Sequence, residues 1–333
     1  NKLMKKIRVA INGFGRIGRA FYKVAKENPE IEIVAVNDLT SLENVQYLLK
    51  YDTVYGISNH TLDGVQYISE KDPTKLPWAK LDIDVVVEST GLFTSSDKAQ
   101  AHIVAGAKRV VVSAPIKDDS MSVIKGETVL MGMNEDKLST CQISSNASCT
   151  TNAGSPLIAI LDEAIGVEKA LLNTVHAYTA SQAIVDGPSK KDMREGRAAA
   201  QNIVPSSTGA AIAVTKVATQ LQGKFDGISI RVPVVAGSIV DVTFISKKNT
   251  TTEEVNEILK RAAGHPRWKG IFTVTEEELV SSDIKGNPHA SIADLAFTRV
   301  VDGNLVKVLA WYDNEMGYTY TLVQHVIKAG MLI

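Results

Sequence analysis

The chain has 333 residues, a formal net charge of −1 and 44% hydrophobic residues. This length predicts about two domains, and the hydrophobic content is sufficient for packed cores. The near-zero charge gives no electrostatic case for a nucleic-acid or membrane-surface protein, and no apolar stretch is long enough to span a bilayer. The chain has only two cysteines and leaves no room for a signal peptide before its first predicted strand, so we expect a soluble, cytoplasmic protein.

The first elements along the chain predict a dinucleotide-binding unit. Residues 6–11 (KIRVAI) are typical of a buried strand, and they lead into a Gly-x-Gly-x-x-Gly motif at residues 13–18. A stretch with apolar residues at helical spacing follows, then a second strand at residues 31–36 that ends just before Asp38. Strand, glycine turn, helix, strand and then an acid is the full context in which this motif binds a dinucleotide.

Each residue of this motif has a physical role in that interpretation. Gly13 permits the tight turn, Gly15 lets the backbone approach a pyrophosphate, and Gly18 lets helix and strand pack closely. Asp38 lies about 20 residues past the last glycine, where its carboxylate would accept hydrogen bonds from the adenosine ribose hydroxyls. Because a carboxylate also repels a 2′-phosphate, we predict NAD rather than NADP as the cofactor.

The rest of the first half predicts further alternation of helices and strands. Residues 40–43 read as a capping box that opens a helix, and residues 84–87 and 109–113 read as buried strands. Ligands of open α/β sheets bind at the carboxyl ends of the strands. Three residues at such ends are therefore candidates for lining the cofactor site, although each could equally belong to an ordinary turn: Thr90, Gly91 and Ser113.

Cys149 is the candidate nucleophile. It lies in the run SNASCTTN at residues 145–152, and the helix-like stretch 156–161 follows. A helix N-terminus stabilises a thiolate, and the thiolate is the nucleophilic form of cysteine, so we expect a lowered pKa at Cys149. The alternative interpretation of this segment alone is a buried cysteine in a polar turn.

The second half predicts a different architecture. Strands are expected at residues 171–178, 227–233, 238–244 and 305–311, and helices starting near 207–209, at 252–262 and near 318–328. We therefore predict an α/β protein: an N-terminal Rossmann domain at residues 1–149 and an α+β catalytic domain with a mixed or antiparallel sheet at 150–315. The C-terminal helix, at about 316–333, is expected to pack back on the first domain.

The motifs together closely resemble those of phosphorylating glyceraldehyde-3-phosphate dehydrogenases of the glycolytic, NAD-dependent type. The cysteine run is highly specific to that family, whereas the glycine motif is shared with many dehydrogenases. The resemblance covers essentially the whole chain. Its segments lie at residues 10–19, 36–38, 145–152, 186–188, 197–202, 205–211 and 311–315.

The resemblance implies a mechanism and a set of site residues. Cys149 would attack the aldehyde of glyceraldehyde 3-phosphate, with His176 as the base, and inorganic phosphate would release 1,3-bisphosphoglycerate from the resulting thioester. Residues implied to bind substrate or phosphate are Ser148, Thr150, Thr179, Ser181, Thr208, Gly209 and Arg231. Residues implied to bind NAD are Gly13, Phe14, Gly15, Arg16, Ile17, Asp38, Ser113 and Asn314. Residues 178–201 would lie across a neighbouring subunit, which implies a homotetramer.

The chain departs from the family pattern at residues 153, 181 and 187, and Gly187-Pro188, in place of a common Leu-Pro, keeps the proline that goes with NAD preference in the family. Many relatives have a second cysteine where this chain has Ala153, and several bacterial relatives have an aspartate where it has Ser181. The first change excludes a short-range disulfide from Cys149, and the second alters the charge beside the substrate phosphate. No metal site is expected, because the histidines and cysteines show no ligand spacing.

Three other functions remain open at this point. An erythrose-4-phosphate dehydrogenase would need only modest changes around the phosphate site. An aspartate-semialdehyde dehydrogenase is disfavoured by Asp38 and by the cysteine signature. A non-catalytic binding or scaffold protein is disfavoured by the intact Cys149, His176 and Arg231.

Overall fold

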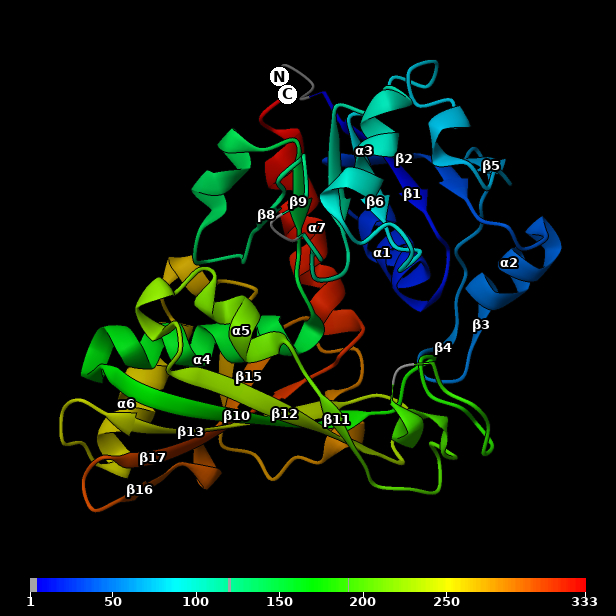
Figure 1. The fold of residues 1–333 in the computed structure, drawn as a ribbon. Helices are drawn as coiled ribbons and strands as arrows, with labels where there is room; N and C mark the ends of the chain where they lie inside the picture. Colours follow the sequence, from blue (N-terminus) through cyan, green and yellow to red (C-terminus); the bar gives the residue numbers. More distant parts are fainter. Residues whose placement is uncertain (1–4, 119–120, 191) are drawn as a thin grey trace. The chain divides into compact units, whose positions relative to one another are not determined.

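The computed structural model describes residues 5–118, 121–190 and 192–333, and the chain divides into two compact units. The N-terminal unit comprises the residues up to Ser148 together with Thr319–Ile333, and the C-terminal unit comprises Cys149–Tyr318 (Figure 1). The expectation of an α/β protein with a Rossmann domain and a second, mixed-sheet domain is confirmed.

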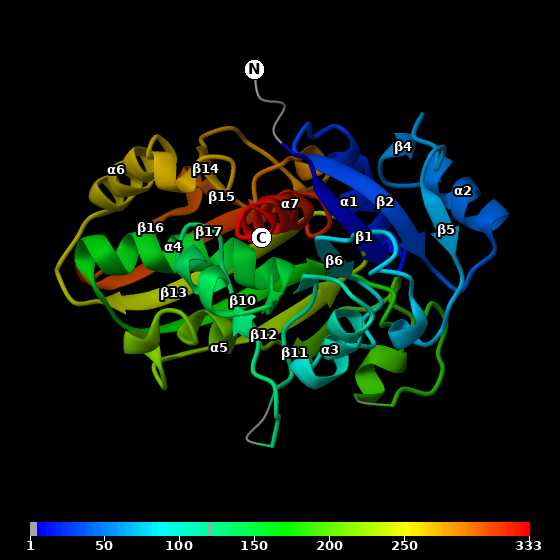
Figure 2. The same ribbon diagram turned by 90° about the horizontal axis from the view of Figure 1, so that it is seen from above.

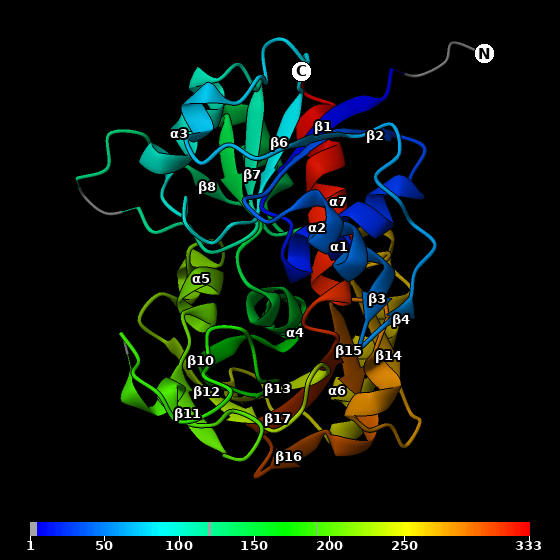
Figure 3. The ribbon, with the colours of Figure 1, turned by 90° about the vertical axis from the view of Figure 1, so that its right-hand side faces the viewer.

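The N-terminal unit is built on a parallel sheet. Within the described residues the sheet has seven strands in the order β5-β2-β1-β6-β7-β9-β8, and every neighbouring pair is parallel. Helices α1 and α3 lie on opposite sides of it (Figures 2 and 3). Both faces are thus covered, which explains why β1 and β6 are almost entirely buried, as the apolar runs predicted.

The elements of this unit are β1 (Ile7–Asn12), α1 (Arg16–Lys26), β2 (Ile31–Asn37), α2 (Leu42–Lys50), β3 (Tyr51–Asp52), β4 (Gly56–Ile57), β5 (Gln66–Ile68), β6 (Val85–Glu88), α3 (Ser96–Val104), β7 (Arg109–Val112), β8 (Glu127–Thr128) and β9 (Ile143–Ser145). The capping box expected at residues 40–43 is wrong. Ser41 is the N-cap of α2, and its side chain accepts a hydrogen bond from the N–H of Asn44 at 3.4 Å. Threonine and serine are both good N-cap residues, and Thr40 and Ser41 are adjacent. The predicted cap was therefore placed one residue too early.

The C-terminal unit is built on a mixed sheet. Its main path runs β11-β12-β10-β13-β17-β15-β14, with β16 paired to β17. Helices α4, α5 and α6 cover one face of this sheet (Figures 1 and 2). Alternate residues of β13 and β17 are buried against that face, and their neighbours point to the other face, where they are partly exposed.

The elements of this unit are α4 (Cys149–Ile165), β10 (Val167–Ala177), β11 (Val204–Ser207), α5 (Ala210–Thr215), β12 (Phe225–Val232), β13 (Ser238–Ser246), α6 (Thr252–Ala263), β14 (Phe272–Thr275), β15 (Ser291–Asp294), β16 (Arg299–Val301) and β17 (Leu305–Tyr312). Helix α7 (Met316–Gly330) starts here and continues into the N-terminal unit. In the part of the chain that the structure describes, every helix is too short or too polar to span a membrane.

Candidate active site

A pocket of about 400 Å³ lies at the carboxyl ends of β1, β2, β5 and β6 in the N-terminal unit. Three of the predicted cofactor residues line it: Gly13, Gly15 and Asp38. Thr90, which the sequence left undecided, lines it as well. Carboxyl ends of neighbouring parallel strands are the usual place for a dinucleotide in this fold.

The glycine loop leaves room for a phosphate at the start of α1. Gly15 is the N-cap of this helix, and a Cβ placed on it would meet no atom within 4 Å. The loop can therefore receive a pyrophosphate next to the positive end of the helix dipole. This fit of backbone and space is what a bound dinucleotide requires.

Asp38 is held in place by backbone N–H groups. One carboxylate oxygen accepts the N–H of Phe14 at 2.7 Å and the other accepts the N–H of Thr40 at 2.9 Å. Burial alone would raise the pKa of Asp38, but these hydrogen bonds outweigh it and lower the pKa below its ordinary value. Asp38 is therefore ionised and retains lone pairs for ribose hydroxyls.

Other predicted cofactor residues lie outside the lining of this pocket. Phe14 is buried, the guanidinium of Arg16 pairs with Asp52 at 2.8 Å, and Ile17 is half-buried on α1. Ser113 directly follows β7 at its carboxyl end. Lining residues that the sequence reasoning missed are Asn12, Asn37, Leu39, Glu70, Lys71, Pro73, Ser89, Leu92 and Phe93. Several of them directly follow or end a strand, and that position could have indicated them.

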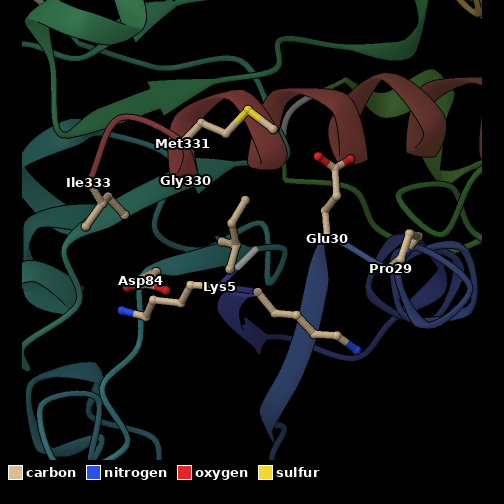
Figure 4. Close-up of a pocket in the computed structure, with 9 residues that line it drawn as sticks. Lys5, Pro29, Glu30, Asp84, Gly330, Met331 and Ile333 are labelled. Atoms are coloured by element: carbon tan, nitrogen blue, oxygen red, sulfur yellow. The ribbon is translucent and has the colours of Figure 1, made fainter. Parts of the chain in front are cut away.

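A second pocket of the N-terminal unit, of about 520 Å³, lies at the opposite ends of these strands (Figure 4). Ile7 begins β1, Glu30 precedes β2 and Asp84 precedes β6, so the pocket meets the amino ends of the parallel strands. Because ligands of this fold bind at the carboxyl ends, we do not assign the cofactor to this pocket.

Cys149, His176 and Arg231 are brought together in the C-terminal unit. Cys149 is the first residue of α4, and its Sγ lies 3.4 Å from His176 Nε2 on β10. Arg231 on β12 is the register partner of His176, and its Nη1 lies 3.1 Å from His176 Nδ1. Residues far apart in the chain therefore form one thiol–imidazole–guanidinium cluster.

The contacts of His176 Nδ1 determine which nitrogen of the neutral ring carries the proton, and so whether Nε2, which faces the thiol, can act as a base. Nδ1 lies 2.6 Å from the carbonyl oxygen of Ala177, which can only accept. Arg231 Nη1, which can only donate, has the same carbonyl oxygen as an acceptor at 3.3 Å, so we assign the proton to Nδ1, and Nε2 then presents its lone pair to Cys149. Burial, and then the charge of Arg231, lower the pKa of His176 to about 4, so the imidazole is neutral at physiological pH and can accept a proton.

The expectation of a lowered pKa at Cys149 is not met. Burial raises the pKa of this thiol, although the charge of Arg231 and hydrogen bonds from Thr150 act in the opposite direction. Because the helix N-terminus does not outweigh the loss of solvation, the resting pair is a neutral thiol beside a neutral imidazole. The neutral His176 Nε2, 3.4 Å from Sγ, is a base within reach of the thiol proton.

Two further predicted residues lie next to Arg231. Its Nη1 donates to the hydroxyl of Thr179 at 3.4 Å, and that hydroxyl is 3.0 Å from the hydroxyl of Ser181. Arg231 Nε is buried and has no hydrogen-bond partner among the described residues. A guanidinium with an unused donor beside two hydroxyls is suited to an anion such as a phosphate.

The other predicted phosphate-binding residues lie in the turn before α5 or next to Cys149 in the chain. Thr208 accepts the N–H of Ala210 at 3.2 Å, and Gly209 is the N-cap of α5. Ser148 is half-buried and directly precedes Cys149. The hydrogen bond that Thr208 accepts is local to this turn.

Tyr312 is a functional candidate that the sequence reasoning missed. Its hydroxyl lies 2.9 Å from Thr150 Oγ1 and 2.7 Å from Thr174 Oγ1, and its ring packs edge-on against His176 with centroids 5.9 Å apart. Burial, and then the proximity of Cys149, raise the pKa of Tyr312 far above its ordinary value. Tyr312 therefore stays protonated and fixes the first turn of α4 against the strand that carries His176. The alternation of buried and partly exposed residues along β17 is consistent with a buried Tyr312, but it does not indicate the hydrogen bonds to Thr150 and Thr174.

Asn314 is buried in the C-terminal unit. Its Oδ1 accepts the N–H of Gly237 and the hydroxyl of Ser238, both at 3.1 Å. With the oxygen so occupied, the amide N–H₂ group is the part that can donate to a ligand. No group of three or more His, Cys, Asp or Glu side chains that could hold a metal ion occurs within residues 5–118, 121–190 and 192–333.

The parallel sheet with its glycine loop and ionised Asp38 defines the class of NAD-dependent oxidoreductases with a Rossmann domain. The cysteine–imidazole pair in the second unit is the arrangement expected for covalent catalysis by a thiol.

Comparison with known families defines this chain more narrowly. Residues 7–96 match the NAD binding domain of glyceraldehyde 3-phosphate dehydrogenase, and residues 148–314 match the C-terminal domain of the same enzyme. The chain belongs to the glyceraldehyde-3-phosphate dehydrogenase family. These matches do not favour an erythrose-4-phosphate dehydrogenase or a non-catalytic protein.

Curated relatives agree along nearly the whole chain. A glyceraldehyde-3-phosphate dehydrogenase of Streptomyces coelicolor is 46% identical, over 97% of this chain and 98% of the relative. That of Borreliella burgdorferi is 48% identical over 95% and 98%, and that of Colletotrichum lindemuthianum is 45% identical over 98% of both chains.

Proposed function

We propose that the protein oxidises D-glyceraldehyde 3-phosphate to 1,3-bisphosphoglycerate, with reduction of NAD and uptake of inorganic phosphate, in glycolysis and gluconeogenesis. The observation that carries the proposal is the cluster of Cys149 Sγ, His176 Nε2 and Arg231, in a chain that belongs to this family. It supplies a nucleophile, a base and an anion-binding group in contact with one another.

The geometry supports a covalent route through Cys149. His176 Nε2 takes the thiol proton as Sγ bonds to the aldehyde carbon, and the imidazolium returns this proton to the alkoxide that forms, which gives a thiohemiacetal and a neutral His176. Bound NAD supplies the hydride acceptor. As the hydride leaves, His176 accepts the hydroxyl proton and a thioester on Cys149 results. Attack by inorganic phosphate forms the acyl phosphate and releases the cysteine sulfur.

The anion sites follow from the same cluster. Thr179, Ser181 and Arg231 would hold the substrate phosphate, because the Thr179 hydroxyl is within hydrogen-bond distance of both the Arg231 guanidinium and the Ser181 hydroxyl. Ser148, Thr150, Thr208 and Gly209 would hold the attacking phosphate, with Arg231 shared between the two anions.

The N-terminal unit would be the NAD-binding domain and the C-terminal unit the catalytic domain. Gly13, Gly15 and Asp38 would contact the dinucleotide in the pocket at the carboxyl ends of the strands. Additional contacts would come from Phe14, Arg16, Ile17 and Ser113. Asn314 would donate its amide N–H to the nicotinamide carboxamide, because its oxygen is already occupied.

The protein would be a cytoplasmic homotetramer. Large apolar side chains on and next to the segment 178–201 are exposed in the single chain, namely Ile184, Val185, Met193 and Ile203. Apolar exposure of this extent is typical of a surface covered by another subunit. Light scattering coupled to size-exclusion chromatography tests this: a tetramer supports the assignment, and a monomer at micromolar concentration contradicts it.

The test of the activity is the initial rate of NADH formation from glyceraldehyde 3-phosphate, with and without inorganic phosphate. Phosphate-dependent turnover that disappears in Cys149→Ser supports the proposal. NADP in place of NAD and erythrose 4-phosphate in place of the triose phosphate are the matched comparisons. Faster turnover of erythrose 4-phosphate, or none of either aldehyde while NAD still binds, would contradict it.

A further inference from the structure

A fully buried carboxyl group lies directly beneath the dinucleotide pocket. Glu88, the last residue of β6, is only 1% exposed. Its Oε2 accepts hydrogen bonds from Asn12 Nδ2 at 2.6 Å and His102 Nε2 at 2.8 Å, and its Oε1 accepts the N–H of Thr90 at 2.8 Å and the Thr90 hydroxyl. Four donated hydrogen bonds fill the acceptor positions of this carboxyl group and fix its orientation.

Trp78 fixes the orientation of this group through His102. The indole N–H of Trp78 points at His102 Nδ1 at 3.1 Å, and an indole nitrogen can only donate. His102 Nδ1 is therefore the acceptor, so Nε2 carries the proton and donates it to Glu88. Trp78 and His102 are both 0% exposed, so bulk water does not reach either hydrogen bond.

One branch of the network reaches the floor of the pocket. Asn12 Oδ1 accepts a hydrogen bond from Asn37 Nδ2 at 2.7 Å, and Asn37 Oδ1 accepts the N–H of Glu70 at 2.9 Å. Asn12, Asn37 and Glu70 all line the pocket. The orientation of the two amide groups is therefore set by Glu88.

The other branch reaches the glycine loop. Thr90, held by Glu88, lines the pocket, and the backbone of Gly13 packs so closely on it that a Cβ on Gly13 would lie 2.7 Å from the Thr90 nitrogen. The hydroxyl of the intervening Ser89 donates to the carbonyl oxygen of Gly13 at 2.8 Å. The position of the loop thus depends on the segment that Glu88 holds.

We propose that Glu88, oriented by His102 and Trp78, is a positioning residue for NAD that holds both the floor of the pocket and the glycine loop in the binding geometry. A network in which each group has its partner is rigid, and a site that is already ordered loses less affinity to ordering when the ligand binds. The proposal rests on the proposed use of this pocket as the cofactor site.

The test replaces His102 by two side chains of similar size. His102→Gln can still accept from Trp78 and donate to Glu88, whereas His102→Leu can do neither. We expect His102→Leu to raise the dissociation constant for NAD about tenfold and His102→Gln to keep it within about threefold of the original chain. The dissociation constants are measured by calorimetry on the full chain, and kcat at saturating NAD is expected to change less than about twofold in both variants.

Two control variants are needed. One shows whether a loss of stability alone changes NAD affinity, and the other shows whether NAD binds in this pocket. Ser144→Ala removes a buried hydrogen bond to His325 in the same unit, 2.8 Å long and remote from the pocket lining, and should lower the melting temperature without changing NAD affinity. Gly15→Ala should weaken NAD binding whether or not Glu88 positions the site, so an unchanged affinity there would instead reject the pocket itself as the cofactor site.

The proposal is overturned if His102→Leu is destabilised but binds NAD normally while Gly15→Ala does not. It is equally overturned if His102→Gln loses as much affinity as His102→Leu. Should His102→Leu fail to fold, Trp78→Phe removes the indole donor and keeps an aromatic ring, although a smaller one, at this buried position. In that variant a dissociation constant raised about threefold supports the proposal, and an unchanged one refutes it.

Discussion

Alanine at Gly13 should disrupt the N-terminal unit, whereas alanine at Gly15 should not. Gly13 has a φ of 92°, which is unfavourable for an L-residue by about 1–2 kcal/mol. Its Cβ would lie 2.7 Å from the Thr90 nitrogen and 2.8 Å from two further backbone atoms of Ser89 and Thr90. Backbone must shift to admit it, and overpacking of this kind costs about 1–3 kcal/mol.

The expected loss for Gly13→Ala is therefore about 2–5 kcal/mol in the free energy of unfolding, a large part of the 5–15 kcal/mol typical of a domain. Gly15 has a φ of −71° and open space around its Cβ position, so Gly15→Ala should change stability by less than about 0.5 kcal/mol. Its methyl group would instead occupy the space that a pyrophosphate needs, and NAD affinity should fall.

Chemical denaturation followed by circular dichroism, together with NAD titration, measures both effects. The two variants should separate: lost stability at Gly13 and lost affinity without lost stability at Gly15. If Gly13→Ala unfolds at the same denaturant concentration as the original chain, the inference that the loop packs closely on Thr90 is contradicted. If Gly15→Ala binds NAD normally, the pyrophosphate does not pass this residue.

Three further predictions concern the histidines and the cysteine. His176→Asn should lower kcat by about 10²–10⁴, because the neutral base is lost, and a loss of less than about tenfold in a steady-state assay would exclude this role. His325 is buried in the N-terminal unit, and burial lowers its pKa from 6.5 to about 3, so between these values the unfolded chain binds a proton that the folded chain does not. The free energy of unfolding therefore falls by about 2 kcal/mol between pH 7 and pH 5 from this group alone. In urea denaturation, His325→Leu should lose less stability over this pH range than the original chain. An equal loss of stability in the two proteins would contradict the lowered pKa of His325. Mild peroxide should convert Cys149 to a sulfenic acid or a mixed disulfide, since Ala153 on the next turn of α4 offers no second thiol, and an intramolecular disulfide from Cys149 in the mass spectrum would refute this.

Local patterns in the sequence predicted the elements of the cofactor half well. The run of Ile7–Asn12 had to be a buried strand, because its apolar residues show no polar alternation, and the glycines after it permit only a tight turn into a helix. The cap of α2 was missed by one residue, because Thr40 and Ser41 offer equivalent hydroxyls and only the path of the backbone selects between them.

The candidate site was predictable where a residue is marked by its neighbours in the chain. Cys149 lies in a polar run before a helix, and Asp38 follows a strand at the expected distance from the glycine loop. No sequence motif next to Tyr312 or Glu88 indicates a role in the site. Tyr312 bonds to Thr150 and Thr174, 162 and 138 residues away, and Glu88 bonds to Asn12, 76 residues away. Strand alternation alone indicates burial but not a partner.

By itself, the sequence determined the first strand, the glycine loop, the helix after it and the second strand, and it predicted Cys149 as the nucleophile, because each depends on chemistry within a few consecutive residues. Only the tertiary structure decided how these groups behave. It brought His176 and Arg231 together through strand register, and it oriented the imidazole by the carbonyl of Ala177. It also raised the pKa of the Cys149 thiol by burial, against the helix N-terminus on which the sequence argument relied. Solvation and long-range pairing depend on what surrounds a residue in space, and this cannot be read from its neighbours in the chain.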